Sequence, residues 1–405
     1  MIKQFSLYGF LKNMQFFEPF FILYLLDMGL NYFQIGLIIS FRSICINLME
    51  IPSGAIADIY GRKNAMIISF VNYIFSFVIF TFTSNIVLLL SAVFLFSIGE
   101  AFRTGTHKAI IFHWLKENNQ TDRKTQVYGY TRSWSKKGSA VSVLISASIV
   151  IFSSGYRWIF LFSIIPYLIG ICNICSYPAY LNYKSGGEKS LKLIFIHLYD
   201  SFKIIFKRNN LKRLIIYTSG FEGVFNVTKE YFQPILKSQA LIIAPLLALE
   251  GEKSIAVIIA IAYFTLNIIS SVSSKKSHKV EKYFSSSKRT ILFLLFAGVV
   301  ILLISSLSIY YKIYIIAIAG FIAFHVLQNI WRPFIVAQYD DLADDDKQAT
   351  ILSIESQSKS TGILILAPVA GFIADTCSIH AAVFMLAIIL IFVQIYAVSQ
   401  KEISA

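Results

Sequence analysis

The stretch that decides the fold of this chain reads Gly54-Ala55-Ile56-Ala57-Asp58-Ile59-Tyr60-Gly61-Arg62-Lys63. It stands between two long apolar segments. Gly54 allows close helix approach, Gly61 suits a tight turn, and Asp58 at a helix end can pair with cations. Arg62 and Lys63 are loop cations, which stay on the cytoplasmic side of a membrane. The stretch therefore predicts a short cytoplasmic turn between two membrane helices.

The composition around this turn is that of a membrane protein. Of the 405 residues, 56% are hydrophobic and 14% are charged, whereas soluble domains are about 25% charged. A helix that crosses the hydrocarbon core needs about 20 residues. Apolar segments of that length predict an all-α membrane protein with twelve transmembrane helices, at residues 8–27, 33–57, 64–83, 86–110, 126–152, 156–180, 211–236, 252–273, 289–309, 313–337, 349–374 and 379–399.

Positive charge is distributed unevenly between the gaps. The net charge is +14, and Lys and Arg concentrate after the second, fourth, sixth and eighth predicted helices. Because cationic loops stay inside the cell, both termini are expected to be cytoplasmic. The bilayer, and not nucleic acid, is the partner that this charge indicates. The Asn-, Lys- and Ile-rich composition favours a bacterial inner membrane.

The longest polar interval, about 182–210, divides the predicted helices into six and six. This predicts an N-terminal six-helix bundle at 1–182, a cytoplasmic linker at 183–210 and a C-terminal six-helix bundle at 211–405. The linker contains an amphipathic stretch, which is either a helix on the anionic inner leaflet or a solvated connector.

The opening stretch resembles the signature of the major facilitator superfamily between helices two and three, G-x-L-A-D-R-x-G-R-K. It departs from that signature chiefly at Ile59, where a basic residue is usual. The resemblance implies the fold of that superfamily and transport by alternating access. It also implies that Asp58, Gly61, Arg62 and Lys63 belong to a cytoplasmic gate; a simple charged turn is the alternative.

Ionisable side chains recur within the apolar segments. Each costs about 2.5–3.5 kcal/mol at the bilayer centre and therefore needs a partner, a cavity or a function. We interpret them as lining a substrate cavity, with ion pairs inside each half as the alternative. The candidates for substrate binding or coupling are Glu18, Arg42, Glu50, Glu100, Arg103, Arg132, Glu222, His325, Arg332 and Glu355.

The spacing of these residues suggests polar stripes along single helices. Glu100, Arg103 and His107 recur at i, i+3 and i+7, which places them on one face of a continuous helix. Glu355 and Lys359 form an i, i+4 pair.

Glu18 is the first candidate for proton coupling. It is expected in the middle of the first helix, beside Pro19 and among phenylalanines, where a carboxyl group would be shielded from water. Glu222 holds a comparable depth in the seventh helix, the counterpart of the first. Both could instead be hydrogen-bonding groups or partners of Arg42 and Lys229.

Four arginines are candidates to meet an anionic part of a substrate. Guanidinium groups bind carboxylate or phosphate through two parallel hydrogen bonds. The candidates are Arg42, Arg103, Arg132 and Arg332. They favour a polar or charged small solute, although nearby glutamates could already neutralise them.

No catalytic, cofactor or metal site is predicted. Cys172 and Cys175 form a CxxC, but within a predicted membrane helix, where we interpret them as packing residues. The chain has no GxxxxGK[ST] loop that would indicate direct use of ATP. A monomer with a small-molecule substrate, and with protons as an optional coupling ion, is expected.

The sequence thus predicts a secondary active transporter of a small polar or charged organic solute. One alternative is a multidrug-type exporter of amphipathic compounds. Another is a polytopic membrane protein with a channel or enzymatic role. The enzymatic role is disfavoured because the histidines are scattered over different segments. Substrate, direction of transport and coupling ion do not follow from the sequence.

Overall fold

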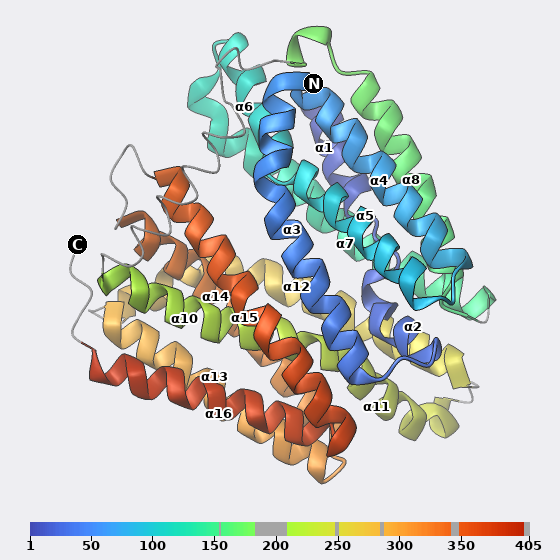
Figure 1. Cartoon of the computed structure of the whole chain (residues 1–405), viewed down its shortest axis with the longest axis vertical. Coiled ribbons are helices and arrows are strands. Elements are labelled where there is room, and N and C mark those ends of the chain that lie inside the picture. Colours follow the sequence, from blue (N-terminus) through green and yellow to red (C-terminus); the bar gives the residue numbers. More distant parts are fainter. Residues whose placement is uncertain (154, 183–208, 248–250, 284–286, 342–347, 401–405) are drawn as a thin grey trace. The chain divides into compact units, whose positions relative to one another are not determined.

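The computed structural model describes residues 1–153, 155–182, 209–247, 251–283, 287–341 and 348–400. Within these ranges the chain consists of helices joined by short connections, without a β-strand (Figure 1). Nine of the described helical segments are long and apolar enough to cross a membrane. The all-α membrane fold is therefore confirmed, while the total of twelve helices and the cytoplasmic position of both termini stay predictions.

The first predicted helix, 8–27, is broken in the structure. It consists of α1 (Ile2–Lys12), a short 3-10 turn η1 (Glu18–Phe20) and α2 (Phe21–Asp27). Pro19 lies in the turn. Because proline lacks an N–H group and suits the first turn of a helix, it starts a new helix and does not continue the preceding one.

The fourth predicted helix, 86–110, is broken as well. α5 (Ile86–Arg103) ends at Thr104, whose backbone is extended, and α6 (Thr106–Glu117) starts after Gly105, which has a φ of +78°. Glycine adopts positive φ without steric cost. The Thr-Gly pair therefore turns the chain between two helices.

The other predicted helices overlap their expected ranges. The seventh continues through three elements, α10 (Asn209–Thr228), η4 (Lys229–Tyr231) and α11 (Phe232–Leu247). The remaining helices are α3 (Tyr32–Tyr60), α4 (Arg62–Phe82), α7 (Lys124–Ser153), α8 (Trp158–Cys175), α12 (Gly251–Tyr283), α13 (Ser287–Tyr310), α14 (Tyr314–Asp341), α15 (Gln348–Thr376) and α16 (Ile379–Ser399).

By internal packing the residues group into two compact units. Unit 1 comprises Met1–Tyr24, Phe41–Lys192 and Glu250–Asn267, and unit 2 comprises Leu25–Ser40, Leu193–Leu249 and Ile268–Ala405. The helices α2, α3 and α12 thus contribute residues to both units. The predicted division into bundles at 1–182 and 211–405 stays a prediction, and most of the predicted linker lies outside the described residues.

Unit 1 is built around aromatic side chains. In it α4 packs against α5 and α8, and α1 packs against α7 and α8. Phe160 stacks on Phe17 and Phe80, with ring centroids 5.4 and 4.8 Å away. Buried aromatic rings remove large apolar areas from the surface and interlock in offset and edge-on pairs. These aromatic contacts hold in place the helices that carry the charged residues of unit 1.

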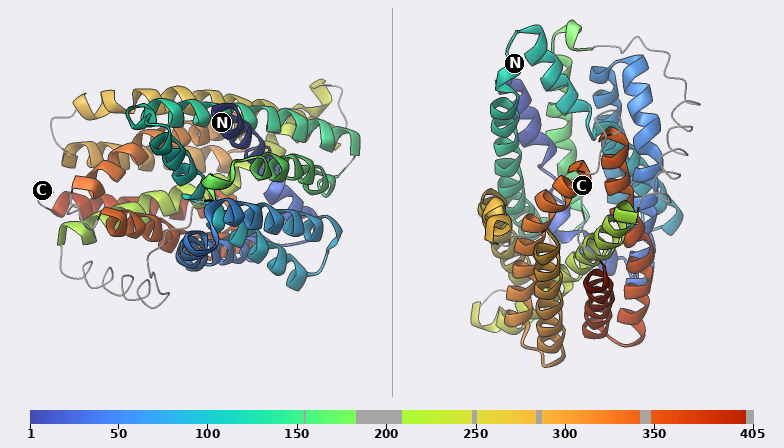
Figure 2. Two further views of the ribbon diagram at one scale, coloured as in Figure 1. Left: turned by 90° about the horizontal axis from the view of Figure 1, so that it is seen from above. Right: turned by 90° about the vertical axis from the view of Figure 1, so that its left-hand side faces the viewer.

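Unit 2 is held together by close helix crossings. Here α10 packs against α15, and α13 runs alongside α14 and α16 (Figures 1 and 2). At the first crossing Gly223 faces Gly362. A Cβ atom added to Gly362 would lie 2.1 Å from the Ser219 carbonyl oxygen and 2.9 Å from the Gly223 Cα. Small residues that let two backbones approach in this way are typical of membrane helix pairs.

A second close contact in unit 2 joins the start of α3 to the end of α15. Asn31 and Gln34 form a reciprocal cap, each side chain accepting the backbone N–H of the other residue. The Asp375 carboxylate accepts the N–H groups of Tyr32 and Phe33 at 2.9 and 2.7 Å. These bonds satisfy the first N–H groups of α3 without water. The negative charge of Asp375 is also stabilised by the positive N-terminal end of the helix dipole.

Glycines bring the two backbones together beside this cap. A Cβ added to Gly36 would lie 2.3 Å from the Ala367 carbonyl oxygen, and one added to Gly371 would lie 2.2 Å from the Tyr32 carbonyl oxygen. The Ser40 hydroxyl donates to the Leu364 carbonyl at 3.0 Å. We call this contact between α3 and α15 the α3–α15 seam.

The seam predicts slow hydrogen exchange at two amides that normally exchange fast. The first N–H groups of a helix have no intrahelical acceptor, but those of Tyr32 and Phe33 are bonded to Asp375. Exchange into D₂O, followed by mass spectrometry, should be slow at both positions in the wild type. It should become fast in Asp375→Ala and stay slow in Asp27→Ala, whose side chain is exposed at the end of α2. Equal exchange in all three proteins would contradict this account.

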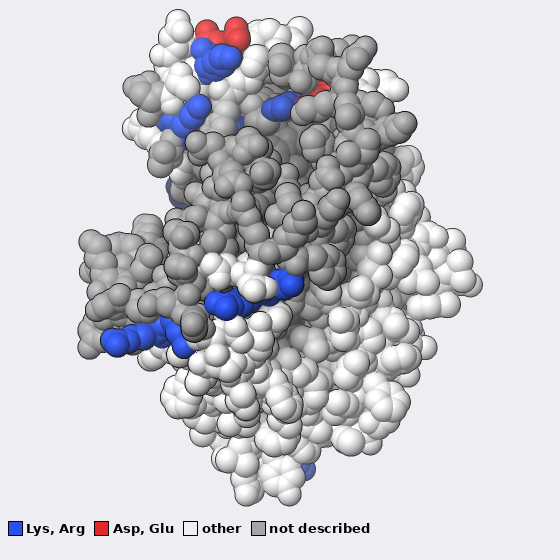
Figure 3. All heavy atoms as spheres, turned by 60° about the vertical axis from the view of Figure 1, so that its left-hand side comes forward, with Lys and Arg blue, Asp and Glu red and all other residues white. Residues whose placement is uncertain are grey.

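The surface is largely apolar. Exposed large hydrophobic residues include Phe152 at 88%, Phe82 at 70% and Phe392 at 66%. On the face in Figure 3, much of the described surface carries neither Lys and Arg nor Asp and Glu. Such a surface suits hydrocarbon and not water.

Candidate functional site

The residues predicted to form a cytoplasmic gate lie at a turn between α3 and α4. Gly61 has φ +98° and ψ 141° and precedes the first residue of α4. The side-chain oxygen of Asn182 accepts the N–H groups of Lys63 and Asn64 at 3.2 and 3.4 Å. A Cβ on Gly61 would lie 2.2 Å from that oxygen. Asn182 therefore caps α4, and only glycine leaves room for it.

The cations of the turn also have defined contacts. The Lys63 ammonium donates to the carbonyl oxygens of Cys175 and Tyr177 at 2.7 and 2.8 Å, at the C-terminal end of α8. Cations are favourable at this end of a helix. Arg62 pairs with Asp58 at 3.3 Å. All four predicted gating residues thus lie in one cluster, whose gating role stays a prediction.

Gly61→Ala should destabilise the protein. The backbone conformation of Gly61 is one that other residues adopt only at a cost of about 1–3 kcal/mol, and the added methyl group would displace Asn182. Thermal unfolding in detergent should show a lower Tm. The matched control is Gly54→Ala, since Gly54 lies within α3 with nothing within 4 Å of an added Cβ. An unchanged Tm in Gly61→Ala would contradict the role of the turn.

Glu100 and Arg103 of α5 form an ion pair, as their spacing predicts. The Tyr73 hydroxyl of α4 donates to Glu100 Oε2 at 2.5 Å and accepts from Arg103 Nε at 3.3 Å. The two charged side chains are only about a fifth exposed, at 19% and 21%. The pair is therefore a fixed group that links α4 to α5, and Glu100 largely neutralises Arg103.

His107 does not continue the stripe of Glu100 and Arg103. The expectation of one continuous helical face is wrong, because the chain turns at Gly105 and His107 belongs to α6. Its ring instead stacks on Tyr8 of α1, with centroids 3.8 Å apart. The ring nitrogen Nε2 lies 3.4 Å from the Tyr177 hydroxyl.

The other candidates of unit 1 are spread over three elements. Glu18 is exposed at the start of η1, so the predicted shielding by its neighbouring phenylalanines is not found. Arg42 of α3 lies over the Phe96 ring, 4.5 Å from its centroid, which is a cation–π contact. Glu50 is part-buried in α3, and Arg132 is exposed on α7.

The most buried acid is Glu222 of α10, with 0% exposure. The Gln328 amide of α14 donates to both carboxyl oxygens at 3.1 Å. Within the described residues no cation is in ion-pair contact with Glu222, although Lys359 interacts with it electrostatically. A carboxyl group in such a place depends on the hydrogen bonds of its surroundings.

Around Glu222 lies a set of charged groups from α14 and α15. Glu355 is 7% exposed and interacts electrostatically with Arg332 and Lys359. No ion-pair contact joins Glu355 to Lys359 in the part of the chain that the structure describes. Glu355 and Lys359, the predicted i, i+4 pair, thus attract each other electrostatically, but their charged atoms are not in ion-pair contact. Arg332 is exposed.

The remaining candidates of unit 2 have other neighbours. The His325 ring is edge-on to Phe225 with centroids 5.0 Å apart, and its carbonyl oxygen accepts from Asn329. Lys229 pairs with Glu230 at 3.6 Å. In the described ranges no group of His, Cys, Asp and Glu could hold a metal ion.

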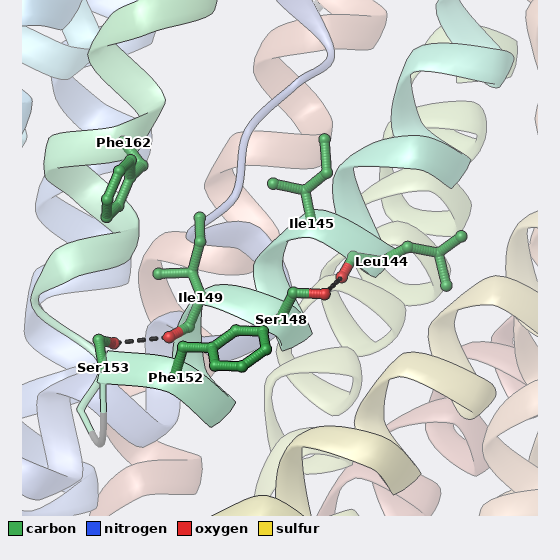
Figure 4. Close-up of a pocket in the computed structure, with 7 residues that line it drawn as sticks. All are labelled: Leu144, Ile145, Ser148, Ile149, Phe152, Ser153 and Phe162. Carbon is green, nitrogen blue, oxygen red and sulfur yellow. Dashed lines mark hydrogen bonds between the residues drawn. The ribbon is translucent and has the colours of Figure 1, made fainter.

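A cavity of about 520 Å³ lies between α7 and α8 (Figure 4). Its polar groups are the hydroxyls of Ser148 and Ser153, which donate to backbone carbonyl oxygens at 3.0 and 2.6 Å. The other lining residues are Leu144, Ile145, Ile149, Phe152 and Phe162. This cavity is apolar and contains none of the predicted site residues.

Three uncharged polar residues proved central and were not predicted. They are Tyr73, which binds the Glu100–Arg103 pair, Gln328, which holds Glu222, and Asn182, which caps α4. An amide or hydroxyl within an apolar segment is a usable signal, because at membrane depth it also needs a partner. The partner itself is not apparent from the sequence.

Comparison with known proteins decides the family. The family model described as Major Facilitator Superfamily matches residues 7–358. The chain belongs to this superfamily. It is a multi-pass membrane transporter and not an enzyme, in agreement with the resemblance of the turn around Gly61.

The relatives extend over nearly the whole chain. An uncharacterized MFS-type transporter, YxaM of Bacillus subtilis (strain 168), is 22% identical over 389 residues, which is 93% of this chain and 90% of that protein. A crystal structure of a mutant of the nucleoside transporter NupG has a TM-score of 0.82 at 12% identity and covers 98% of this chain and 99% of its own. A peptide transporter, POT, gives 0.78 at 10% identity, with 98% and 93% covered. At these identities the structures show a shared fold.

Proposed function

We propose that this transporter is a secondary active carrier that moves a small polar or charged organic solute by alternating access and couples it to protons. The main observation that supports this proposal is that apolar helices hold ionisable side chains through specific hydrogen bonds. The clearest case is Glu222, whose carboxyl group accepts hydrogen bonds from the Gln328 amide. Such groups are rare in membranes and mark substrate or proton pathways. Two six-helix bundles with cytoplasmic termini complete the proposal.

Proton coupling would supply enough free energy for accumulation. One elementary charge that moves across 100 mV is worth about 2.3 kcal/mol, which corresponds to a concentration ratio of about 50. Glu222 is the proposed proton acceptor in preference to Glu18. Its carboxyl group is buried and bound by an amide, whereas Glu18 is exposed.

The class of solute is supported by the structural relatives. They are a nucleoside transporter and a peptide transporter, and nucleosides and small peptides are small polar compounds. We therefore propose uridine and dialanine as the first probes, together with the organic anions succinate and glycerol 3-phosphate. Amphipathic cations serve as the probe for a multidrug-type exporter.

Reconstitution of the purified protein into liposomes tests this proposal. A carrier should show uptake that saturates with concentration, exchange of labelled for unlabelled solute, and stimulation by an inward proton gradient. Flux that rises linearly with concentration and shows no exchange would indicate a channel. Stimulation by the proton gradient only for export of amphipathic cations would favour the exporter.

A further inference from the structure

Several described cations of unit 1 have no acidic partner in contact, and three of them lie on the packed helices α1 and α7. Lys12 of α1 and Arg132 and Lys136 of α7 form no ion pair with a carboxylate among the described residues. Arg103 is different, since Glu100 neutralises it. Arg132 and Lys136 lie within the candidate membrane span Gln126–Ser153, where an ionised side chain without a partner is costly.

Packing of α1 on α7 gathers these cations on one side of unit 1. A Cβ on Gly9 would lie 2.8 Å from Ser135 Oγ, and one on Gly138 would lie 2.3 Å from the Phe10 carbonyl oxygen. The two helices therefore touch through glycines just before Lys12. On α7, Arg132 and Lys136 are one turn apart and share a helix face.

The charges act on one another. Lys12 is repelled by Arg103 and Arg132, and Lys136 is repelled by Arg132 and attracted by Glu18. Like charges that interact raise each other's free energy unless an anion lies between them or water surrounds them. Glu18 is the described acid that attracts Lys136, whereas Glu100 is paired with Arg103.

The end of α1 at Lys12 contacts the middle of α8. The Lys12 carbonyl oxygen accepts a hydrogen bond from the Tyr167 hydroxyl at 3.2 Å, and Tyr167 stands in the middle of α8. The Tyr167 ring contacts that of Tyr73, with centroids 5.1 Å apart, and Tyr73 is bonded to Arg103. The backbone of Lys12 is therefore linked through two buried tyrosines to the Glu100–Arg103 pair.

The buried hydroxyl of Tyr8 lies near Arg103. Tyr8 is 1% exposed, and its hydroxyl has no hydrogen bond of normal geometry to any described group, although it interacts with Arg103. A buried hydroxyl without a partner costs free energy. Near cations it is suited to donate to an anion that is bound only part of the time.

We propose that Lys12, Arg132 and Lys136 form the binding site for the anionic group of the transported solute, a carboxylate or a phosphate. This proposal rests on the proposed function and adds the substrate class to it. The planar guanidinium of Arg132 would bind two oxygens of the anion, and the two ammonium groups would complete its neutralisation. The substrate is then an organic anion and not a neutral nucleoside or a cation.

The test compares Lys12→Gln, Arg132→Gln and Lys136→Gln with Lys137→Gln. Lys137 is a matched control on the same helix, since its ammonium lies over the Trp134 ring, 4.5 Å from the centroid. Each protein is reconstituted into phosphatidylcholine vesicles without anionic lipid. Uptake of succinate, glycerol 3-phosphate, uridine and dialanine is then measured.

We expect saturable uptake of at least one of the two anions by the wild type and by Lys137→Gln. Each of the three site variants should raise the half-saturating concentration by about tenfold or more, the scale expected for a lost charge-assisted hydrogen bond. Lys12→Arg, which keeps the charge, should retain most of the uptake. It also shows whether a loss in Lys12→Gln reflects charge or misfolding.

Saturable uptake of uridine or dialanine, with the three glutamine variants unaffected, would overturn the anion site but leave the carrier function intact. Absence of saturable uptake of every probe would instead count against the proposed function. Inhibition of the wild type by phosphatidylglycerol, without binding of either soluble anion in a thermal-shift titration, would assign the cations to a lipid headgroup and also overturn the proposal.

Discussion

Glu222→Gln should abolish solute accumulation driven by a proton gradient while leaving exchange of labelled for unlabelled solute intact. The amide has the shape of the carboxyl group and its oxygen can still accept from Gln328, but it cannot take up a proton. The accumulation ratio that an inward pH gradient produces should therefore fall to about 1. Exchange needs no net proton movement and should continue.

The matched control for this prediction is Glu230→Gln. Glu230 lies in η4, close to Glu222 in the chain, but it is paired with Lys229 and is not fully buried. Its variant should accumulate solute like the wild type. Glu18→Gln is measured in parallel, because the sequence indicated Glu18 first. Full accumulation by Glu222→Gln would remove Glu222 from the coupling pathway, and loss in Glu18→Gln alone would assign that role to Glu18.

Gly362→Leu should prevent stable folding of unit 2. The crossing of α10 and α15 leaves no space at this position, since an added Cβ would lie 2.1 Å from the Ser219 carbonyl oxygen. The clash is with backbone, which cannot rotate away as a side chain can. Overpacking typically costs about 1–3 kcal/mol and more where the backbone must move, so a loss of about 3 kcal/mol or more is expected.

Thermal unfolding and the yield of monodisperse protein in detergent measure this loss. The control is Gly129→Leu, at a position of α7 where an added Cβ meets nothing within 4 Å. Gly362→Ala should lie between the two, because one methyl group already meets the same carbonyl. A Tm of Gly362→Leu equal to that of Gly129→Leu would show that α10 and α15 can separate without loss of stability.

The fold could be predicted from the sequence largely because long apolar segments permit few alternatives. A hydrocarbon solvent leaves only the helix to satisfy backbone groups within one segment, so the helices overlap the predicted ranges. The breaks at Gly105 and before Pro19 were missed, because the apolar residues on both sides of the short polar stretches 103–108 and 12–15 were joined into single predicted helices. The sequence contains Gly105 and Pro19 within these predicted helices, but whether a glycine or a proline breaks a helix depends on the local backbone conformation.

The candidate site was predicted best where partners are close in the chain. The Glu100–Arg103 pair follows from helical spacing alone. The bond between Glu222 and Gln328 joins residues 106 positions apart, and nothing in a single sequence indicates which amide will reach a buried acid. Exposure likewise depends on packing, which is why Glu18 was expected to be shielded and is not.

The contact of Asn182 with the turn at Gly61 also determines where the chain can be cut. The residue that caps α4 comes after α8, so a fragment that stops short of residue 182 would lose the acceptor for two α4 amides. Two polypeptides produced together from a gene divided after that codon would keep α4 and its cap on the same piece. A division only a few codons earlier would separate them.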